Sequence, residues 1–452
     1  MFKLRKLHKY AGIFSGIVLL FLAVTGFFLN HDNWKFLYTT TIPNTYLPKS
    51  TTTLDKRLFT SYLVNAKADR KIAAGFRGIF VSVDAHPYQK VLNIPVHQLI
   101  KEGDVYYAAT TEGIWRSEDA GMHWHIWALP HTVVTSLSAD DGKLLAAIDK
   151  KQLFLLDGKG RIIQKRQVLI EKEALEHDIT LSRFVRDVHY GRGLFDDGLS
   201  LLLNDFAAIW LSMLAVTGYL LWYYIGRIRR KKEYKHTIRM LLKFHNSSWV
   251  LVAVIPLVLL ALTGILLDHV NYFSSFMKRT VVPSHYLPPV YHTLKEDIWS
   301  VDYQNGVYRI GNRYGVYRST DMRHWKMENK GFAYKMMHQQ GKLYVSGMGA
   351  PNRIYNNGHW RRLEHTPHMF KSINVNSNKV SYFSSATDSS LLPIFQTTTL
   401  YTLLYSIHDG SFFASWWVYV NDIASILLLL LLFTGLQLWY KRYRQRFPSN
   451  KS

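Results

Sequence analysis

Four apolar runs limit what this chain can fold into, because each is long enough to cross a lipid bilayer. They span residues 10–29, 206–225, 250–267 and 418–440, and a helix of roughly 20 apolar residues crosses the hydrocarbon core. Aromatic side chains suited to a membrane interface gather at the ends of the runs. These are Trp34, Trp210, Trp222, Trp249, Trp416, Trp417 and Trp439. The sequence therefore predicts a membrane α-helical bundle with four transmembrane helices.

The long segments between the runs are too polar to span a membrane. They contain short stretches, such as those that begin at Val105, Lys143, Gly306 and Lys342, that are bounded by turn residues and are typical of β-strands. We therefore expect two mainly β extracytoplasmic inserts. The predicted parts are 1–31 (first transmembrane helix with its N-terminal tail), 32–188 (first insert), 189–226 (a pre-helix segment and the second helix), 227–244 (a basic loop), 245–269 (third helix), 270–407 (second insert), 408–440 (a pre-helix segment and the fourth helix) and 441–452 (a basic tail).

The positive charge of the chain, a formal +23, is concentrated beside the apolar runs. The basic residues form three groups: Lys3, Arg5, Lys6 and Lys9; Arg227, Arg229, Arg230, Lys231, Lys232, Lys235, Arg239 and Lys243; and Lys441, Arg442, Arg444, Arg446 and Lys451. Basic segments stay on the cytoplasmic side of a membrane and contact anionic lipid. We predict a multi-pass protein of a bacterial inner membrane, with cytoplasmic termini, periplasmic inserts and no nucleic-acid partner. No small-residue cleavage site follows the first run, so we expect an uncleaved signal anchor.

The two halves of the chain carry the same ordered residues around their apolar runs. The first and third runs share a His, a Thr-Gly pair and a second His, and the two histidines are 23 residues apart in one half and 24 in the other. Around the first and third runs, His8, Thr25-Gly26 and His31 match His245, Thr263-Gly264 and His269. Around the second and fourth runs, His189, Gly191, Asn204-Asp205, Thr217-Gly218 and Trp222 match His408, Gly410, Asn421-Asp422, Thr434-Gly435 and Trp439. Such similarity indicates parallel repeats related by a pseudo-two-fold axis along the membrane normal. We attribute the Thr-Gly pairs themselves to helix packing, which favours small residues.

Histidines are the candidate cofactor ligands, because the chain has no Cys and so cannot hold an iron–sulfur cluster or a covalent c-type haem. Six of them lie at equivalent helix ends: His8, His245, His31, His269, His189 and His408. Neutral imidazole is an ordinary axial ligand of haem iron in a helical bundle. Since 23 helical residues span roughly 35 Å, the inner and outer histidines lie near opposite membrane faces. We predict two b-type haems, one near each face, with their iron held by these histidines.

Carboxylates near the helix ends offer an alternative, in which histidines bind a metal ion directly with Asp205, Asp422, Asp32 or Asp268. Such a site needs several ligands in one small volume. We favour a different role for Asp205 and Asp422, which is to orient a histidine or a neighbouring helix.

A turn motif marks both inserts. Ser117, Asp119, Gly121 and Trp124 resemble the Asp-box of sialidase-like β-propellers, and a shorter second copy without the Gly ends at Trp325. In this motif polar side chains bond the turn backbone and the Trp packs beneath it. We predict a structural role. A carbohydrate-active enzyme is a third, weaker hypothesis, because no Arg triad or Tyr nucleophile is evident in the sequence.

The helix patterns resemble the PepSY-associated transmembrane helix family. The residues that carry this resemblance are Leu7-His8-Lys9-Tyr10-Ala11-Gly12 with Thr25-Gly26, His189-Tyr190-Gly191, Ile407-His408-Asp409-Gly410, Phe244-His245 with Thr263-Gly264, and the Thr-Gly-x-x-x-Trp endings at Trp222 and Trp439. The resemblance implies an inner-membrane di-haem ferric-siderophore reductase in which His8, His189, His245 and His408 occupy the family's histidine positions. His31 and His269 are less general in the family. The inserts depart from it, since Asp-box-like strands stand where a PepSY αβ unit is usual.

Together these features lead us to expect a haem-dependent oxidoreductase. It would move electrons across the membrane and reduce periplasmic ferric iron, held by a siderophore or in another ferric complex. The chain has no Gly-rich dinucleotide fingerprint, so we expect a quinol, a flavin or a partner protein as the electron donor. The alternative is a non-enzymatic, membrane-anchored periplasmic binding or signalling protein.

Overall fold

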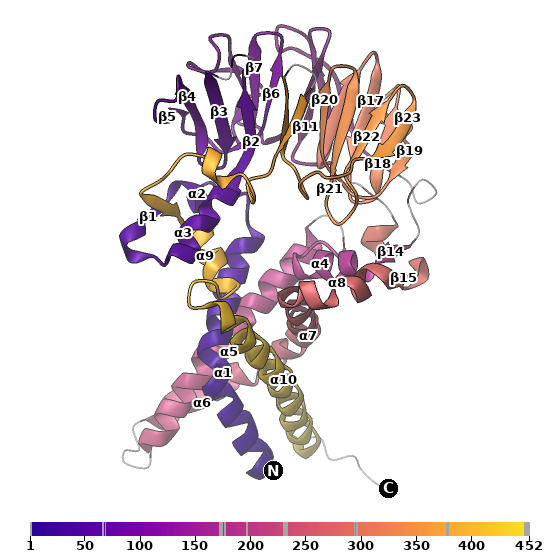
Figure 1. Cartoon of the computed structure of the whole chain (residues 1–452). Helices are drawn as coiled ribbons and strands as arrows, with labels where there is room; N and C mark the ends of the chain where they lie inside the picture. The colour runs from indigo at the N-terminus through magenta and orange to yellow at the C-terminus, as the bar shows by residue number, and fades with distance from the viewer. Residues whose placement is uncertain are drawn as a thin grey trace.

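The computed structural model describes residues 2–65, 67, 69–170, 175, 178–195, 198–228, 234–292, 294, 297–376 and 379–446. The described chain has a helical bundle at one end and β-sheets at the other (Figure 1). The basic residues Arg229, Arg230, Lys231, Lys232 and Lys451 lie outside the described residues.

Four long helices form the bundle and confirm the predicted transmembrane segments. They are α1 (Phe2–Asn30), α5 (Leu199–Ile228), α7 (Trp249–Asp268) and α10 (Val418–Arg446). Each is long and apolar enough to cross a membrane. Helices α1 and α7 each pack on both α5 and α10. Alanines in the shared core, including Ala23, Ala207, Ala253 and Ala424, allow close approach of the helices where a larger side chain would hold them apart.

The β-rich inserts form short antiparallel sheets, in which each strand pairs with the next along the chain. The described residues contain five four-stranded sheets and one two-stranded sheet of this kind. The sheets are β2 (Phe59–Val64) to β5 (Gln89–Leu92) with β3 (Arg70–Gly75) and β4 (Gly78–Val83); β6 (Val96–Glu102), β7 (Val105–Thr110), β8 (Gly113–Ser117) and β9 (His125–Ala128); β10 (Val134–Asp140), β11 (Lys143–Ile148), β12 (Gln152–Leu156) and β13 (Ile162–Gln167); β16 (Ser300–Gln304), β17 (Val307–Gly311), β18 (Gly315–Ser319) and β19 (Lys326–Lys330); β20 (Ala333–Gln339), β21 (Lys342–Gly347), β22 (Arg353–Asn356) and β23 (His359–Arg362); and β24 (Ser372–Asn376) with β25 (Lys379–Phe383).

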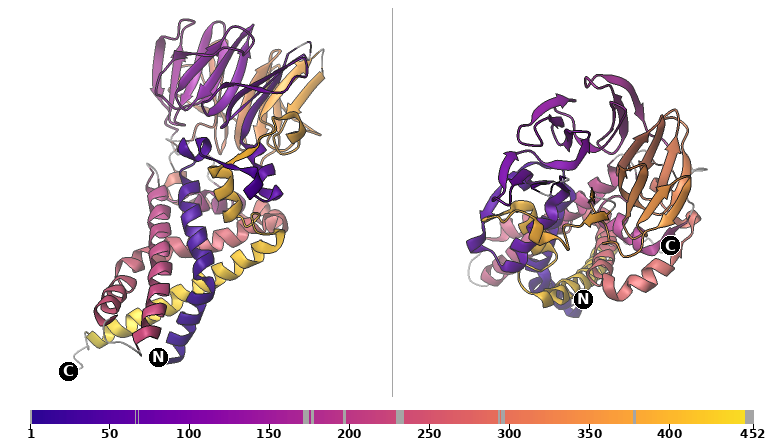
Figure 2. Two further views of the ribbon diagram at one scale, coloured as in Figure 1. Left: turned by 90° about the vertical axis from the view of Figure 1, so that its left-hand side faces the viewer. Right: turned by 45° about the horizontal axis from the view of Figure 1, so that its top comes forward.

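The two inserts build one closed ring rather than two separate β units. The first strands of the sheets contact one another in the order β2, β6, β10, β16, β20 and β24, and β24 returns to β2. This arrangement is a β-propeller, with three blades from each insert among the described residues (Figure 2, right). The expectation of β-rich inserts is confirmed. The structure adds that the two inserts share one propeller, in which blades of one insert cover the open sides of blades from the other.

Polar side chains on the first strands join neighbouring blades. Ser136 Oγ accepts a hydrogen bond from Val301 N (3.1 Å) at the junction of β10 and β16. At the junction that closes the ring, Ser372 Oγ accepts from Tyr62 N (2.9 Å). A serine hydroxyl supplies the partner that a strand's backbone N–H would otherwise lack. Both joins connect residues of different inserts, so the ring depends on both.

Two small sheets join the inserts again, between the propeller and the bundle. Strand β1 (Thr41–Pro43) pairs with β26 (Thr397–Thr399), and β14 (Ile179–Thr180) pairs with β15 (Val281–Val282). Each small sheet takes one strand from each insert. The two halves of the described chain are therefore joined by strand pairing at two equivalent places.

Short helices occupy segments that we predicted as insert ends or as a loop. They are α2 (Phe36–Thr39), α3 (Lys49–Leu54), α4 (Leu181–His189), α6 (Lys235–His245), α8 (Val270–Arg279) and α9 (Leu400–His408). The basic loop predicted at 227–244 thus contains a helix, α6, because Ile238 and Leu241 pack against Leu221 of α5. An apolar stripe on one side of a short helix stabilises it by packing.

The Asp-box residues form the turn contacts expected of that motif. Asp119 Oδ1 accepts hydrogen bonds from Met122 N (3.1 Å) and His123 N (2.9 Å), and Trp124 Nε1 donates to Gly121 O (2.9 Å). The second copy uses Asp321 in the same way. In both copies these bonds shape the turn between the third and fourth strands of a blade.

Candidate cofactor site

Four of the six predicted histidines meet in two pairs. His8 of α1 and His245 at the end of α6 have ring centres 6.4 Å apart. His189 at the end of α4 and His408 at the end of α9 have ring centres 6.3 Å apart. Each pair takes one histidine from each half of the chain. The start of α1, which carries His8, lies at the end of the bundle away from the propeller, whereas α4 and α9, which end at His189 and His408, lie near the propeller (Figure 1).

A threonine holds one nitrogen of each paired histidine. The four Nδ1–Oγ1 distances are His8–Thr434 2.8 Å, His245–Thr217 2.8 Å, His408–Thr25 2.9 Å and His189–Thr263 3.1 Å. In every case the threonine comes from the other half of the chain. Each pair thus connects four helices.

The hydrogen bonds of these threonines assign the tautomer of the histidines. Each threonine hydroxyl donates to the carbonyl four residues earlier in its own helix, for example Thr25 to Phe21 (2.6 Å) and Thr434 to Leu430 (2.8 Å). Its proton is therefore already used, so the hydroxyl oxygen accepts from the histidine Nδ1–H. The lone pair of each neutral imidazole then lies on Nε2, the atom free to bind a metal.

The glycine after each threonine leaves space for the imidazole. A Cβ atom on Gly26 would lie 3.2 Å from His408 Cε1, and one on Gly435 would lie 3.6 Å from His8 Cε1. Gly218 and Gly264 stand in the same relation to His245 and His189. The interpretation of Thr-Gly as ordinary helix packing is therefore incomplete. In each of the four Thr-Gly pairs, the threonine bonds a histidine and the glycine leaves room for its ring. The sequence contained a hint of this role, because the number of Thr-Gly pairs equals the number of paired histidines.

The spacing within each pair fits two imidazoles on one iron. A metal–imidazole bond is about 2 Å long, so two imidazoles on opposite faces of one metal ion have ring centres roughly 6 Å apart. Both observed distances meet this requirement. Among the described residues no group of three or more His, Asp or Glu could hold a metal ion, which does not favour the directly bound metal ion considered above. The donor set fits a bis-histidine haem.

An apolar pocket lies beside the first pair. It has a volume of about 390 Å³ and is lined by Met213, Val216, Thr217, Met240, Leu241 and Phe244 with Ser212. Thr217 is also the partner of His245. The volume lies in the usual range for small-molecule and cofactor sites, about 300–1,000 Å³. Neither His8 nor His245 lines this pocket, and Met240 and Phe244 in its lining are exposed.

The two pairs are separated along one helix. His8 lies near the start of α1, and Thr25, which holds His408, lies 17 residues further along it. At ~1.5 Å per residue this is roughly 25 Å, within a bilayer core of about 30 Å. The pairs therefore lie toward opposite ends of the membrane-spanning region.

The Asn-Asp pairs before the second and fourth helices serve two purposes. Asn204 Nδ2 donates to the backbone carbonyl of His189, and Asn421 Nδ2 to that of His408, both at 3.1 Å. The neighbouring aspartates instead reach the remaining predicted histidines.

His31 and His269 are paired with carboxylates and not with each other in the contacts of the described chain. His31 Nε2 lies 3.1 Å from Asp205 Oδ2, and His269 Nε2 lies 2.6 Å from Asp422 Oδ2. His31 also stacks on Trp34, with ring centres 4.2 Å apart. The structure therefore places these two histidines, with Asp205 and Asp422, outside the two imidazole pairs. Asp32, the other candidate from the first half, pairs with Arg192 (3.7 Å).

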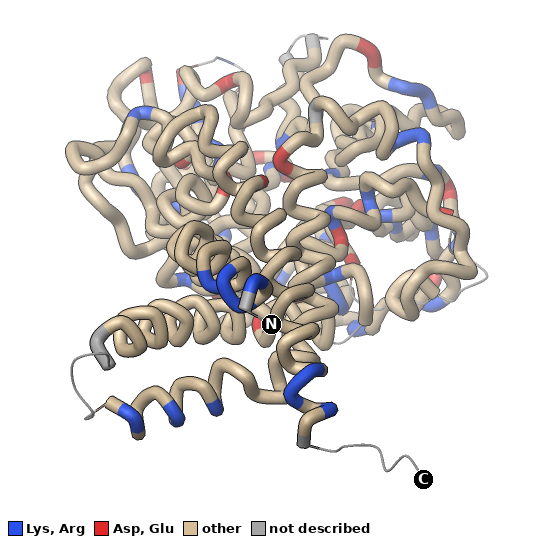
Figure 3. The backbone as a smooth tube through the Cα atoms, turned by 90° about the horizontal axis from the view of Figure 1, so that it is seen from below, with Lys and Arg blue, Asp and Glu red and all other residues tan. Residues whose placement is uncertain are grey.

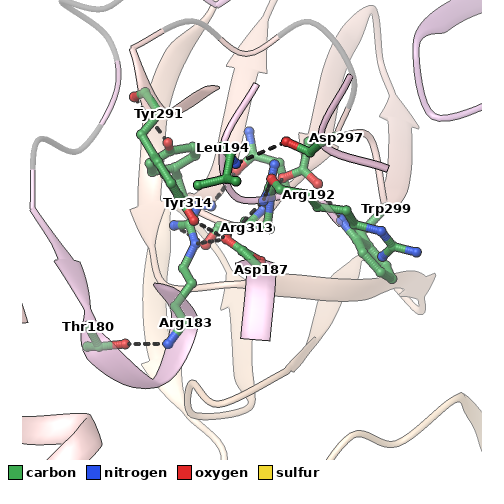
Figure 4. Close-up of polar contacts among 12 residues, drawn as sticks. Thr180, Arg183, Asp187, Arg192, Leu194, Tyr291, Asp297, Trp299, Arg313 and Tyr314 are labelled. Atoms are coloured by element: carbon green, nitrogen blue, oxygen red, sulfur yellow. Dashed lines mark hydrogen bonds and ion pairs between the residues drawn. The ribbon is translucent and has the colours of Figure 1, made fainter. Parts of the chain in front are cut away.

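Buried ion pairs fasten the helices of the second histidine pair to the propeller. Arg313, between β17 and β18, pairs with Asp187 of α4 (2.9 Å) and with Asp297 (2.9 Å), and Figure 4 shows this network between α4 and its blade. On the other side Asp55 pairs with Arg77 and accepts from Thr402 Oγ1 of α9 (2.8 Å). Both helices start at a threonine cap that bonds the first turn.

If the second pair binds a haem, replacement of Thr263 by Val is expected to weaken that binding. Valine keeps the shape of threonine but cannot accept from His189 Nδ1, and loss of such an orienting partner typically lowers metal affinity by about 10- to 100-fold. Haem retention against apomyoglobin as an acceptor measures the effect. The exposed Thr53→Val variant should retain haem as the parent does. Equal loss from both variants would contradict the role of Thr263.

The comparisons with known proteins address the family and not the chemistry. No curated protein matches the chain. Solved structures that are similar in part include the computationally designed Ika8 protein (7% identity, 73% of this chain and 81% of that chain, TM-score 0.32), the Pan2 WD40 domain of Neurospora crassa (7%, 75% and 88%, 0.30) and Sqt1 of Saccharomyces cerevisiae (8%, 72% and 81%, 0.29). At these TM-scores the likeness carries no argument. The family model of the PepSY-associated TM region matches residues 5–442, nearly the whole sequence. The chain therefore belongs to the family of the PepSY-associated TM region.

Proposed function

We propose that this membrane protein is a di-haem oxidoreductase that moves electrons across a bacterial inner membrane to ferric iron in the periplasm. The observation that carries the proposal is that four imidazoles form two pairs, each with the spacing that one iron requires. In each imidazole the Nδ1–H donates a hydrogen bond to a threonine hydroxyl. His8 and His245 would hold one haem, and His189 and His408 the other. Haem b, when bound by two histidines, accepts and donates single electrons.

The distribution of charge supports the orientation. Seen from the end opposite the propeller, Lys and Arg lie at the free ends of α1, α6 and α10 (Figure 3). Basic segments favour the cytoplasmic side, so the termini would be cytoplasmic and the propeller periplasmic. His8 and His245 would then lie near the cytoplasmic face, where a quinol, a flavin or a partner protein supplies the electrons.

The substrate would lie on the propeller side, near His189 and His408. One electron converts Fe(III) to Fe(II), and the lower charge weakens its binding to hard oxygen ligands. A ferric siderophore or another ferric complex is therefore the proposed substrate class. The equivalent contacts made by the two halves also support the duplication expected from the repeated sequence.

The visible spectrum of the detergent-purified protein, oxidised and then reduced with dithionite, tests the proposal. We expect the spectrum of a low-spin b-type haem and about two haems per chain, as two bis-histidine sites require. Addition of a ferric siderophore should then reoxidise the reduced protein. A colourless protein from haem-replete cells would refute the oxidoreductase and leave the non-enzymatic periplasmic binding or signalling protein as the better account.

A further inference from the structure

The propeller contains a group of basic side chains that the proposed electron path does not use. This basic cluster consists of Arg57, Lys150, Arg192, Lys335 and Lys371. Its members come from both inserts: Lys150 from the turn between β11 and β12, Lys335 from β20, and Lys371 from the residue before β24. Lys335 is only 6% exposed.

Lys150 and Arg192 lie beside the same ring, that of Trp299, and the pKa values of the lysines in the cluster shift in the direction expected for neighbouring like charges. Burial and, to a smaller extent, the charge of Arg192 lower the pKa of Lys150 to about 8. Burial lowers the pKa of Lys335 to about 8, with an added effect of Lys150. Burial also lowers the pKa of Lys371 to about 7, with added effects of Lys335 and Arg57. Like charges gathered away from water oppose folding unless an anion compensates them.

The protein itself compensates only part of this charge. Arg192 pairs with Asp32 (3.7 Å), Lys150 lies near Asp32, Asp297 and Asp149, and Arg57 lies near Asp409. Lys335 Nζ donates to His97 O (3.0 Å), and Lys371 Nζ donates to Arg57 O (2.7 Å) and Phe59 O (2.8 Å). In the part of the chain that the structure describes, neither lysine forms an ion pair with a carboxylate. A neutral glutamine side chain can also donate hydrogen bonds to backbone carbonyls. The structural role of these contacts in joining the blades therefore does not explain why the residues are positively charged.

Aromatic rings lie beside the cluster. Lys150 Nζ lies 4.1 Å from the centre of the Trp299 ring, and Arg192 Cζ lies 5.8 Å from it. Trp299 in turn contacts Tyr334, with ring centres 6.0 Å apart. Cations next to aromatic faces suit a ligand that carries both negative oxygens and flat rings.

The cluster also lies close to the second histidine pair. Arg192 follows His189 by three residues, which limits the separation of their Cα atoms to roughly 11 Å. We propose that the basic cluster and Trp299 form a binding site for a small polyanionic metal chelate, held next to His189 and His408. The inference rests on the proposed function for its choice of a metal chelate, and it adds the charge class of that chelate.

Binding of redox-inert gallium(III) complexes to the full-length protein tests the site without any electron transfer. The probes are a polyanionic gallium(III) catecholate and a cationic gallium(III) hydroxamate, and tryptophan fluorescence in zwitterionic nanodiscs follows binding. We expect tight, salt-sensitive binding of the catecholate alone. Lys335→Gln and Lys150→Gln should each weaken it at least about ten-fold, because charged hydrogen bonds are stronger than neutral ones. Lys143→Gln, on an exposed residue of β11, should bind like the parent.

Several outcomes separate the site from the proposed function. The proposed site is wrong if the protein binds both probes equally, or if Lys335→Gln and Lys150→Gln have no effect on binding. If the same protein holds two haems per chain, the oxidoreductase proposal still stands. Charge-dependent binding to a haem-free protein would uphold the site and refute the oxidoreductase. Phosphatidylglycerol nanodiscs that abolish catecholate binding through the same lysines would assign the cluster to a lipid headgroup and overturn the chelate site. Circular dichroism of each variant shows whether it is folded.

Discussion

The His245→Ala variant is expected to lose about half of the bound haem and to stop electron transfer from the cytoplasmic side. His245 lies beside His8, at a spacing of 6.4 Å between ring centres, so in the proposed haem site its removal would leave the iron with one protein ligand. The pair of His189 and His408 lies roughly 25 Å away along α1 and should keep its haem. Haem per chain, determined by the pyridine haemochrome method, should fall from about two to about one, as one bis-histidine site is lost.

His236 offers a matched control, because it lies on the same helix, α6, and is exposed. His236→Ala should retain both haems and full electron transfer. If His245→Ala also retains both haems, His245 is not a ligand and the pairing with His8 is wrong. Loss of haem from both variants alike would instead indicate that α6 tolerates no change.

The Arg313→Met variant is expected to destabilise the propeller by about 3–5 kcal/mol, the usual effect of breaking a buried ion pair. Arg313 is buried and pairs with Asp187 and Asp297, both of which are also buried (Figure 4). Methionine fills similar space but leaves both carboxylates without this cation. Urea unfolding followed by near-ultraviolet circular dichroism measures the change in the free energy of unfolding.

Arg361, exposed on β23, provides the control, and Arg361→Met should unfold at the urea concentration of the parent. Because Asp187 lies two residues before His189, Arg313→Met should also release haem from the second pair faster than from the first. An unfolding midpoint equal to that of Arg361→Met would show that the network contributes little to stability.

The sequence was sufficient to predict the membrane spans and a set of six candidate histidines, but not which of the six meet. The apolar runs are confirmed as α1, α5, α7 and α10, because run length and hydropathy directly reflect the thickness of the bilayer. The repeated positions of His8 and His245 indicated that they are equivalent. A two-fold axis brings equivalent residues together only when they lie near the axis. A repeated pattern does not give the distance of a residue from the axis, so it could not show that His31 and His269 stay apart.

The partners of the histidines could not be predicted in the same way. Thr434 lies 426 residues from His8, and Thr25 lies 383 residues from His408. A repeated pattern shows that two positions are alike, but it does not say whether a contact stays within one half or crosses to the other. The aspartates illustrate this, since Asp205 bonds His31 of its own half, whereas every threonine bonds a histidine of the opposite half.

The single propeller could not be predicted from the sequence either, because it also depends on contacts between the two halves. Local strand pairing within a blade was visible in the sequence, because turn residues separate adjacent strands. Closure depends on contacts such as Ser136 with Val301, which are 165 residues apart. The polar residues that make these joins do not look different from other serines on strands.

The sharing of one ring between two inserts has a consequence for biogenesis. During synthesis from the N-terminus, the strands of the first three blades are made before α7 and before the strands of the remaining three blades. Leu145 and Leu153 then lack the rest of their core cluster, which includes Ile310 and Tyr317 of the second insert, and a half-made ring exposes apolar surface that favours aggregation. The ring, and with it the core that both inserts share, can therefore be completed only after the second insert has been made.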